Sequence, residues 1–269
     1  MITDFFLEQG STHHICQDYA VAGKDWIAVA DGCSMSAHSD WGARLLCKAA
    51  EKVLQHSSIM DEDFSTLVRG EAMAYAMQLG LEWTDMLATL LVAKRSGPDI
   101  QIGVMGDGYL VGCRKDGVRW LTGFNYSTNA PYYLAYGSDA EALDRYNVMF
   151  GRGVLHHTVT NLDNGEVMAR NTVDCRMHIM AEYEAVDLDF IGLTTDGLNS
   201  FTKLIRNDTS VEKVELSAAE VVLPLLSTQL YTNAFLQRRC RKAMDKFNKE
   251  GVYHYDDFAM AGLWLGDGE

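Results

Sequence analysis

The sequence predicts a single α+β domain, in which short buried strands end on acidic residues and helices occupy separate stretches. Two apolar runs carry this prediction: residues 26–30 precede Asp31 and Gly32, and residues 190–195 precede Asp196 and Gly197. Such a run fixes a carboxylate at a strand end, and the glycine lets the backbone turn. One domain is favoured because 269 residues, 48% of them hydrophobic, can form a full-sized core, and only 3 are proline.

Composition and charge exclude several classes of function. Asp and Glu outnumber Lys and Arg by 37 to 23, which gives a net charge of -14. Such a surface repels nucleic acids and anionic membranes, so we expect neither as a partner. We also expect no signal peptide and no membrane-spanning segment. The six scattered cysteines form no Cys-x-x-Cys pair, which indicates free thiols, a cytoplasmic location and no zinc site.

The first half of the chain alternates strands and helices. Residues 1–22 predict an edge strand, a polar turn and a second short strand. His13 and His14 in that turn point to opposite sides of an extended chain, so at least one of them is expected on the surface. Residues 40–56 predict a helix with Ser39 or Asp40 as its N-cap. Residues 61–80 predict a second helix, whose buried stripe we expect to be Phe64, Leu67, Val68, Met73 and Met77.

A group of strands follows, at residues 86–93, 100–104, 109–114 and 118–122. The last two are joined by a hairpin at residues 115–117, where Asp-Gly supplies the positive φ angles of a tight turn. Asp107 lies between Gly106 and Gly108 at another strand junction. Either a tight turn or an acid directed at a metal explains this pattern.

The second half of the chain is less regular. Residues 123–180 show weak periodicity, apart from a hairpin at Asn164 and Gly165, which is typical of a functional flap or a variable insertion. Residues 215–249 predict one or two helices, with a capping box from Ser217 to Glu220. The basic run at residues 238–242 is interpreted as a solvated face. A final strand at residues 255–265 is entered through Asp256 and Asp257.

The acids at these strand ends predict a metal site. Asp31, Asp107, Asp196 and the Asp256-Asp257 pair all stand at strand ends or turns, and Asp18 lies in the first polar segment. Carboxylates that share a cleft repel one another unless cations lie between them. Because histidine and cysteine are absent from the strand ends, the pattern favours Mg²⁺ or Mn²⁺ over zinc. Two such ions can lower the pKa of a bridging water and polarise a phosphoryl oxygen.

The order of these motifs resembles the metal-dependent protein phosphatase family (PPM), of the protein phosphatase 2C type. Six short motifs occur in the family's order: Cys16-Gln17-Asp18, Val29-Ala30-Asp31-Gly32, Ala88-Thr89-Leu90, Gly106-Asp107-Gly108, Thr195-Asp196-Gly197-Leu198 and Asp256-Asp257-Phe258-Ala259. The segments at residues 10–18 and 39–43 resemble a divergent bacterial branch of that family.

This resemblance implies a four-layer α-β-β-α sandwich of two antiparallel sheets flanked by helix pairs. It implies that Asp31 bridges two Mg²⁺ or Mn²⁺ ions, that the Gly32 carbonyl binds one of them, and that Asp196 and Asp256 bind the second. Asp18 would hold metal-bound water, and Asp107 would bind a third, weaker metal. The implied reaction is hydrolysis of phosphoserine or phosphothreonine in a protein substrate by the bridging hydroxide, without a phospho-enzyme.

The chain departs from the family pattern at four places. His13 stands where the family usually has a phosphate-binding arginine, so His13 is the candidate substrate-binding and catalytic residue there. Cys33-Ser34 replaces Gly-Gly, Ala88 replaces a glycine, and Ser200 replaces an aspartate associated with the third metal. These departures leave open an alternative: a catalytically weak protein that binds and regulates a partner.

Other hydrolase classes are less well supported. Asp187 and Asp189 imitate the Asp-x-Asp motif of haloacid-dehalogenase-type phosphatases, but they occur late in the chain and lack the residues that usually follow. A serine-hydrolase elbow and a P-loop are both absent from the sequence.

Overall fold

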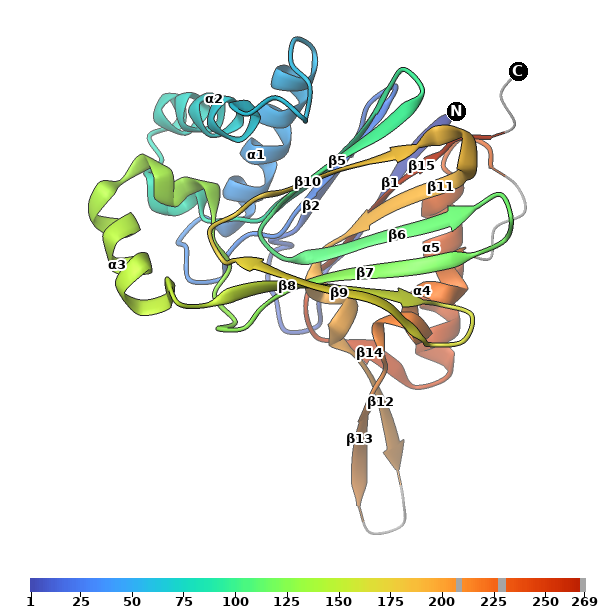
Figure 1. The fold of residues 1–269 in the computed structure, drawn as a ribbon. Helices are drawn as coiled ribbons and strands as arrows, with labels where there is room; N and C mark the ends of the chain where they lie inside the picture. The colour runs from blue at the N-terminus through green and yellow to red at the C-terminus, as the bar shows by residue number, and fades with distance from the viewer. Residues whose placement is uncertain (207–209, 227–230, 267–269) are drawn as a thin grey trace.

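The computed structural model describes residues 1–206, 210–226 and 231–266. Its helices and strands follow one another in this order (Figure 1): β1 (Ile2–Glu8), β2 (Tyr19–Ala22), β3 (Trp26–Ala30), α1 (Ser39–Leu54), α2 (Phe64–Leu79), β4 (Leu90–Ser96), β5 (Asp99–Met105), β6 (Gly108–Arg114), β7 (Arg119–Tyr126), α3 (Ala140–Phe150), β8 (Val154–Asn161), β9 (Val167–Asp174), β10 (Ile179–Glu184), β11 (Leu188–Thr194), β12 (Phe201–Arg206), β13 (Val211–Glu215), α4 (Ala218–Leu226), α5 (Phe235–Lys249), β14 (Val252–His254) and β15 (Phe258–Trp264).

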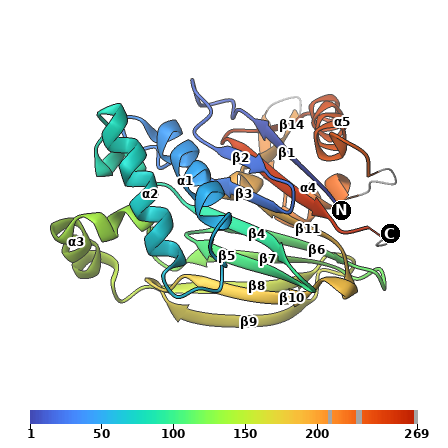
Figure 2. The ribbon, with the colours of Figure 1, turned by 90° about the horizontal axis from the view of Figure 1, so that it is seen from above.

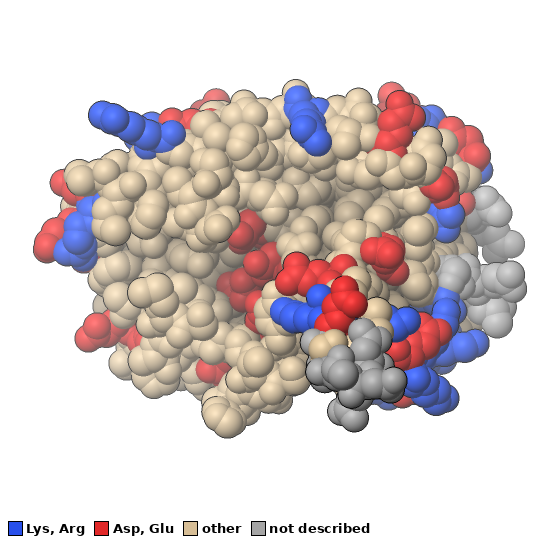
Figure 3. Space-filling view, turned by 90° about the horizontal axis from the view of Figure 1, so that it is seen from below, with Lys and Arg blue, Asp and Glu red and all other residues tan. Residues whose placement is uncertain are grey.

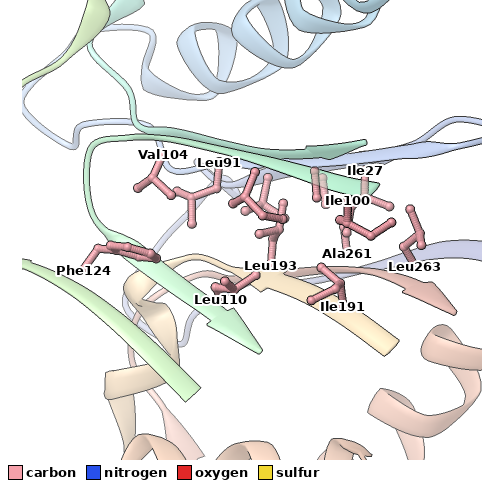
Figure 4. Packing of buried hydrophobic residues seen from close by; sticks show 14 of the residues in the cluster. Ile27, Leu91, Ile100, Val104, Leu110, Phe124, Ile191, Leu193, Ala261 and Leu263 are labelled. Carbon is pink, nitrogen blue, oxygen red and sulfur yellow. The ribbon is translucent and has the colours of Figure 1, made fainter. Parts of the chain in front are cut away.

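Two antiparallel sheets form the centre of the molecule. One has the strand order β1-β15-β11-β6-β7-β8-β9 and the other has the order β10-β5-β4-β3-β2. Their facing sides share a core in which Ile27 and Leu91 of one sheet lie opposite Leu193 and Ala261 of the other (Figure 4). Alternating apolar residues on each strand produce this core, because successive side chains point to opposite faces of a sheet.

Helix pairs cover the outer faces of both sheets. Residues of α1 and α2 pack on β3 and β4, and residues of α4 and α5 pack on β6, β11 and β15. Figure 2 shows the two pairs on opposite sides of the strands. The predicted four-layer α-β-β-α sandwich is therefore confirmed.

Several local predictions differ from the structure. The first strand of the central group begins at Leu90, because residues 83–86 form a 3₁₀ turn held by a capping box between Glu82 and Asp85. In α2, Leu67 and Met77 are exposed, and the buried face consists of Phe64, Val68, Ala72 and Ala76. Small residues take this face because α2 packs against α1, and alanines let two helices approach closely. The N-cap of α1 is His38, one residue before the predicted Ser39.

Residues 123–180, for which we expected a flap or variable insertion, contain three strands and one helix. Strands β8 and β9 extend the seven-stranded sheet, and β10 pairs with β5 in the other sheet. The predicted hairpin at Asn164 and Gly165 joins β8 to β9, and Gly165 has a φ of 73°. Helix α3 lies near α2 at one end of the sandwich (Figures 1 and 2).

Three further features complete the description of the fold. All six cysteines are free thiols. In the part of the chain that the structure describes, no helix is both long enough and apolar enough to cross a membrane. A third, three-stranded sheet in the order β13-β12-β14 projects from the sandwich beside the ends of the central strands (Figure 1).

Candidate functional site

A polar cleft of about 250 Å³ lies where strand ends of the two sheets meet. Its walls contain four aspartates that are far apart in the sequence, together with further residues from the loops around them: His13, Gln17, Asp31, Gly32, Cys33, Ser34, Asp107, Asn129, Pro131, Tyr133, Asp196 and Asp256. Figure 3 shows acidic side chains gathered in a hollow on this face of the molecule. Every site residue predicted from the sequence, apart from Asp18, lines this cleft.

Asp31 is held at the end of the fully buried strand β3. Its backbone N–H donates to Thr89 Oγ1 at 3.0 Å, and its carbonyl accepts the Thr89 N–H at 2.9 Å. Gly32 next to it is bridged to Ala88. A Cβ atom on Gly32 would stand 2.2 Å from the Ser39 carbonyl oxygen, so only glycine fits here. The sequence motif around residue 88 thus fixes the Asp31 backbone.

Asp18 lies behind the cleft rather than in its wall. It is 3% exposed, and Thr195 Oγ1 donates to its Oδ2 at 2.5 Å. The same Thr195 hydroxyl accepts the Ala259 N–H at 3.0 Å, which ties β2, β11 and β15 together at this point. Burial raises the pKa of Asp18 well above its usual range, while the Thr195 hydrogen bond opposes that rise. Burial and the Asp18 charge likewise raise the pKa of Asp31.

Asp107 enters the cleft from a turn that only glycines allow. Gly106 and Gly108 have φ angles of 115° and 133°, and a Cβ atom on either would lie 2.7 Å from a neighbouring atom. The predicted tight turn is therefore present, and it places the Asp107 side chain in the cleft, whereas a metal at Asp107 stays a prediction. Burial first, and the Asp196 charge second, raise the pKa of Asp107 to about 8.

Asp196 begins a short 3₁₀ turn directly after β11. Burial, followed by the charge of Asp256, raises its pKa. A Cβ atom on the adjacent Gly197 would lie 1.7 Å from the Asp257 carbonyl oxygen, so the Asp-Gly motif lets two strand ends touch. Asp187 and Asp189, the acids of the rival motif, stand at the opposite end of β11 and outside the cleft.

His13 lies between two consecutive acids. Its Nδ1 is 2.8 Å from Asp257 Oδ2, and its Nε2 is 3.6 Å from Asp256 Oδ1. The neighbouring His14 is exposed, as predicted for at least one of the pair, although the segment forms a turn and a bend and not an extended chain. The imidazole of His13 therefore lies in the cleft, and the carboxylates of Asp256 and Asp257 orient it.

Asp257 is a residue whose role the sequence did not reveal. Its side chain is 1% exposed, and it accepts the backbone N–H groups of Gly10 at 2.7 Å and Gln17 at 2.6 Å in addition to its contact with His13. Asp257 thus anchors the loop that carries His13. The only signal in the sequence was its position next to Asp256, which cannot show which of two adjacent acids is buried.

The cleft has the chemistry of a site for hard divalent cations. Its lining includes four carboxylates and the backbone of Gly32, but no Lys or Arg. Oxygen donors of this kind suit Mg²⁺ and Mn²⁺, and bound cations would offset the burial and the mutual repulsion that raise the pKa values of Asp31, Asp107 and Asp196. Among the described residues, no three His, Cys, Asp or Glu side chains are already arranged as a metal-ligand group. The types of donor in the cleft fit hard divalent cations.

Comparisons with known proteins agree with this arrangement. The family model described as protein phosphatase 2C matches residues 10–133. The structure superposes on the Mycobacterium tuberculosis serine/threonine phosphatase PstP/Ppp with a TM-score of 0.53 at 16% identity, covering 97% of each chain. It superposes on the PPM Ser-Thr phosphatase MsPP from Mycobacterium smegmatis, in complex with cacodylate, with a TM-score of 0.53 at 15% identity, covering 99% of each chain.

The chain has the protein phosphatase 2C fold. The resemblance predicted from the motifs is confirmed, since the matched region contains four of the six motifs in full and the superpositions extend over nearly the whole chain. A third similar structure, the catalytic domain of PstP with 2 manganese ions, has a TM-score of 0.50 at 16% identity and covers 97% of this chain and 96% of that one. A search of curated proteins finds no match.

The four departures from the protein phosphatase 2C pattern have different structural consequences. Ala88 forms the bridge to Gly32, and Cys33 lines the cleft while its N–H donates to the Leu87 carbonyl at 2.8 Å. Ser200 is buried, and its hydroxyl donates to the Gly197 carbonyl at 2.7 Å, so it adds no ligand to the cleft.

The segment after β7 contributes residues that the sequence did not single out. Asn129, Pro131 and Tyr133 form one wall of the cleft. Asn129 has a φ of 51°, an uncommon conformation for a residue other than glycine. Burial, together with the neighbouring Cys33 and Asp31, raises the pKa of the Tyr133 hydroxyl, which therefore stays protonated as a hydrogen-bond donor.

Proposed function

We propose that this protein is a metal-dependent phosphatase that hydrolyses phosphoserine or phosphothreonine in protein substrates. The observation that carries the proposal is the convergence of Asp31, Asp107, Asp196 and Asp256, from four separate segments, in one cleft lined by no Lys or Arg. The fold supports it, because the similar structures are serine/threonine phosphatases, one of them with 2 manganese ions.

The residues of the cleft have separate roles in the proposed reaction. Asp31, the Gly32 carbonyl, Asp196 and Asp256 would hold two Mg²⁺ or Mn²⁺ ions, and Asp107 would hold a third. When bound, these ions supply positive charge for the phosphoryl oxygens and lower the pKa of a water. Asp18, fixed by the Thr195 hydroxyl, accepts a hydrogen bond from water at the back of the site. His13, when protonated, donates to a phosphoryl oxygen, and Asp257 keeps its ring in the cleft.

The position of His13 favours a second candidate function, that of a catalytically weak protein that binds and regulates a partner. An arginine would present several donors to a phosphate with its charge always present, whereas His13 already shares its nitrogens with Asp256 and Asp257. The predicted cytoplasmic location and signalling role apply to both candidates and stay predictions.

The two functions are separated by activity with and without metal. The purified protein is assayed on para-nitrophenyl phosphate and on a phosphothreonine peptide, with Mn²⁺ or EDTA. Asp31→Asn and Asp196→Asn should each lower the Mn²⁺-dependent rate by more than about 100-fold, since even outer-shell changes at metal sites cost about 10- to 100-fold. Asp187→Asn is the matched control, because Asp187 is exposed at the other end of β11.

Activity that survives EDTA, or that Asp31→Asn leaves unchanged, refutes the metal-dependent mechanism. Absence of hydrolysis on both substrates, with Mn²⁺ bound, favours the regulatory candidate.

A further inference from the structure

The hairpin of β12 and β13 has no counterpart in the sandwich layers. Among the described residues, it pairs with the short strand β14 and with no other strand, and it projects away from the body of the molecule (Figure 1). Phe201 and Val252 anchor its base in the core, whereas Leu204, Ile205 and Val214 farther along are 38% to 43% exposed. The projecting part is thus not needed to complete the core, and it leaves large apolar side chains in water.

One face of this hairpin forms a groove. The register places Thr202 opposite Tyr253 and Leu204 opposite Lys213, so these side chains share a face. With residues from the neighbouring loops they enclose a hollow of about 460 Å³, the hairpin groove, lined by Ser11, Thr202, Leu204, Lys213, Tyr253, His254 and Tyr255.

The floor of the hairpin groove is apolar, with a single cation at its side. Leu204, Tyr253 and Tyr255 are 43%, 50% and 40% exposed. Lys213 Nζ lies 4.9 Å from the centre of the Tyr255 ring and 3.6 Å from Glu215 Oε1, so its charge is shared between these two neighbours. Exposed tyrosines beside an aliphatic side chain are typical of surfaces that bind polypeptide.

The hairpin groove adjoins the acidic cleft, although the two hollows share no lining residue. Tyr255 directly precedes the cleft residue Asp256, and Ser11 is two residues before His13. Backbone hydrogen bonds of 3.2 Å, from Ser11 N–H to the His254 carbonyl and from Thr12 N–H to the Tyr255 carbonyl, join the two walls. The cleft has a volume of about 250 Å³, close to the size of a phosphorylated side chain, and the hairpin groove offers a surface beside it for the neighbouring residues of a protein substrate.

We propose that the hairpin groove docks an extended polypeptide segment of the protein substrate, next to the phosphorylated residue, with an apolar side chain of that segment against Leu204 and Tyr253. This inference rests on the proposed phosphatase function. A small phosphate ester does not reach the hairpin groove. The hydrolysis rate should therefore depend on the groove for polypeptide substrates and not for small esters.

The test compares two neighbouring positions on opposite faces of β12. Leu204→Ser removes an apolar contact from the groove, and Ile205→Ser makes the same kind of change on the other face at 38% exposure against 43%. The probes are para-nitrophenyl phosphate and phosphorylated casein, both with Mn²⁺. We expect Leu204→Ser to raise KM for phosphorylated casein about tenfold, the scale of one buried leucine side chain, and to leave hydrolysis of the aryl phosphate unchanged. Ile205→Ser should match the wild type on both.

Three results overturn the docking role: unchanged kinetics of Leu204→Ser on phosphorylated casein, an equal loss on both probes, or an equal loss in both variants. Light scattering tests the competing occupant, a second copy of this chain. A wild-type dimer that Leu204→Ser converts to a monomer also overturns the proposal. If the wild type hydrolyses neither probe with Mn²⁺, the proposed function itself fails. As a folding control, a cooperative thermal unfolding transition is measured for each variant.

Discussion

Asp256 and Asp257 are adjacent and chemically identical, yet the structure predicts opposite consequences for their removal. The side chain of Asp257 is 1% exposed and accepts three hydrogen bonds, from Gly10, Gln17 and His13 at 2.6 to 2.8 Å. The side chain of Asp256 is 41% exposed and accepts one, from the Asp257 N–H at 2.9 Å. We expect Asp257→Ala to destabilise the fold and Asp256→Ala to spare it while abolishing metal-dependent activity.

The magnitude follows from those contacts. Each hydrogen bond to a charged group contributes about 1.5 to 3 kcal/mol, and the three share one carboxylate, so their sum is an upper limit. Removing one partner of a buried charged network costs about 3 to 5 kcal/mol, which is our expectation for Asp257→Ala. For Asp256→Ala we expect a loss of less than about 1 kcal/mol in unfolding free energy. One hydrogen bond to a partly exposed carboxylate is lost, while the repulsion between Asp256 and Asp196 is relieved.

The assay is urea unfolding of both variants in EDTA, so that metal binding does not enter the comparison, followed by phosphatase activity with Mn²⁺. Equal losses of unfolding free energy in the two variants would show that the buried Asp257 side chain does not stabilise the loop at residues 10–17. Full activity of Asp256→Ala would remove Asp256 from the proposed ligand set.

Two further predictions concern pH and metal. Burial, with Arg69 as the second cause, lowers the pKa of His178 to about 4, and no described group pairs with its Nε2. Because the unfolded state, with a pKa near 6.5, binds the extra proton, stability is complete above pH 6.5 and falls as the pH drops towards 4. Between pH 7 and 5 the wild type should therefore lose about 2 kcal/mol more than His178→Leu in urea unfolding, and identical losses would contradict this. Mn²⁺ at a hundredfold excess over its Kd should add about 2.7 kcal/mol to the unfolding free energy, and a similar gain in Asp31→Asn would argue for binding elsewhere.

Much of the fold was predictable because local patterns agreed with it. The apolar run before Asp31 is buried along its whole length as β3, and the Asp-Gly at residues 116–117 forms the expected hairpin. Period-2 and period-3.6 patterns report which side of an element is apolar. They failed in α2, where Met77 is apolar but exposed and Ala76 is small but buried, since hydrophobicity does not reveal how closely a neighbouring helix approaches.

The candidate site was predictable to the extent that its acids mark strand ends. Asp31, Asp107 and Asp196 could be picked out because each is followed by glycine after an apolar run. The residues that hold them could not, because Thr195 reaches Asp18 across 177 positions and Asp257 reaches Gln17 across 240. Contacts of such separation depend on how the strands are ordered in the sheets.

The sequence by itself predicted most strands and helices outside residues 123–180 and placed acids at the strand ends, because these follow from residue type and spacing over a few positions. The hard-cation chemistry that these acids suggest stays a prediction. Only the tertiary structure decided that Asp256 faces the cleft while Asp257 is buried, that His13 lies between them, and that the groove beside β12 adjoins the same cleft. Which side chains are buried and which lie close together depends on how the two sheets pack, and this cannot be read from any single segment of the chain.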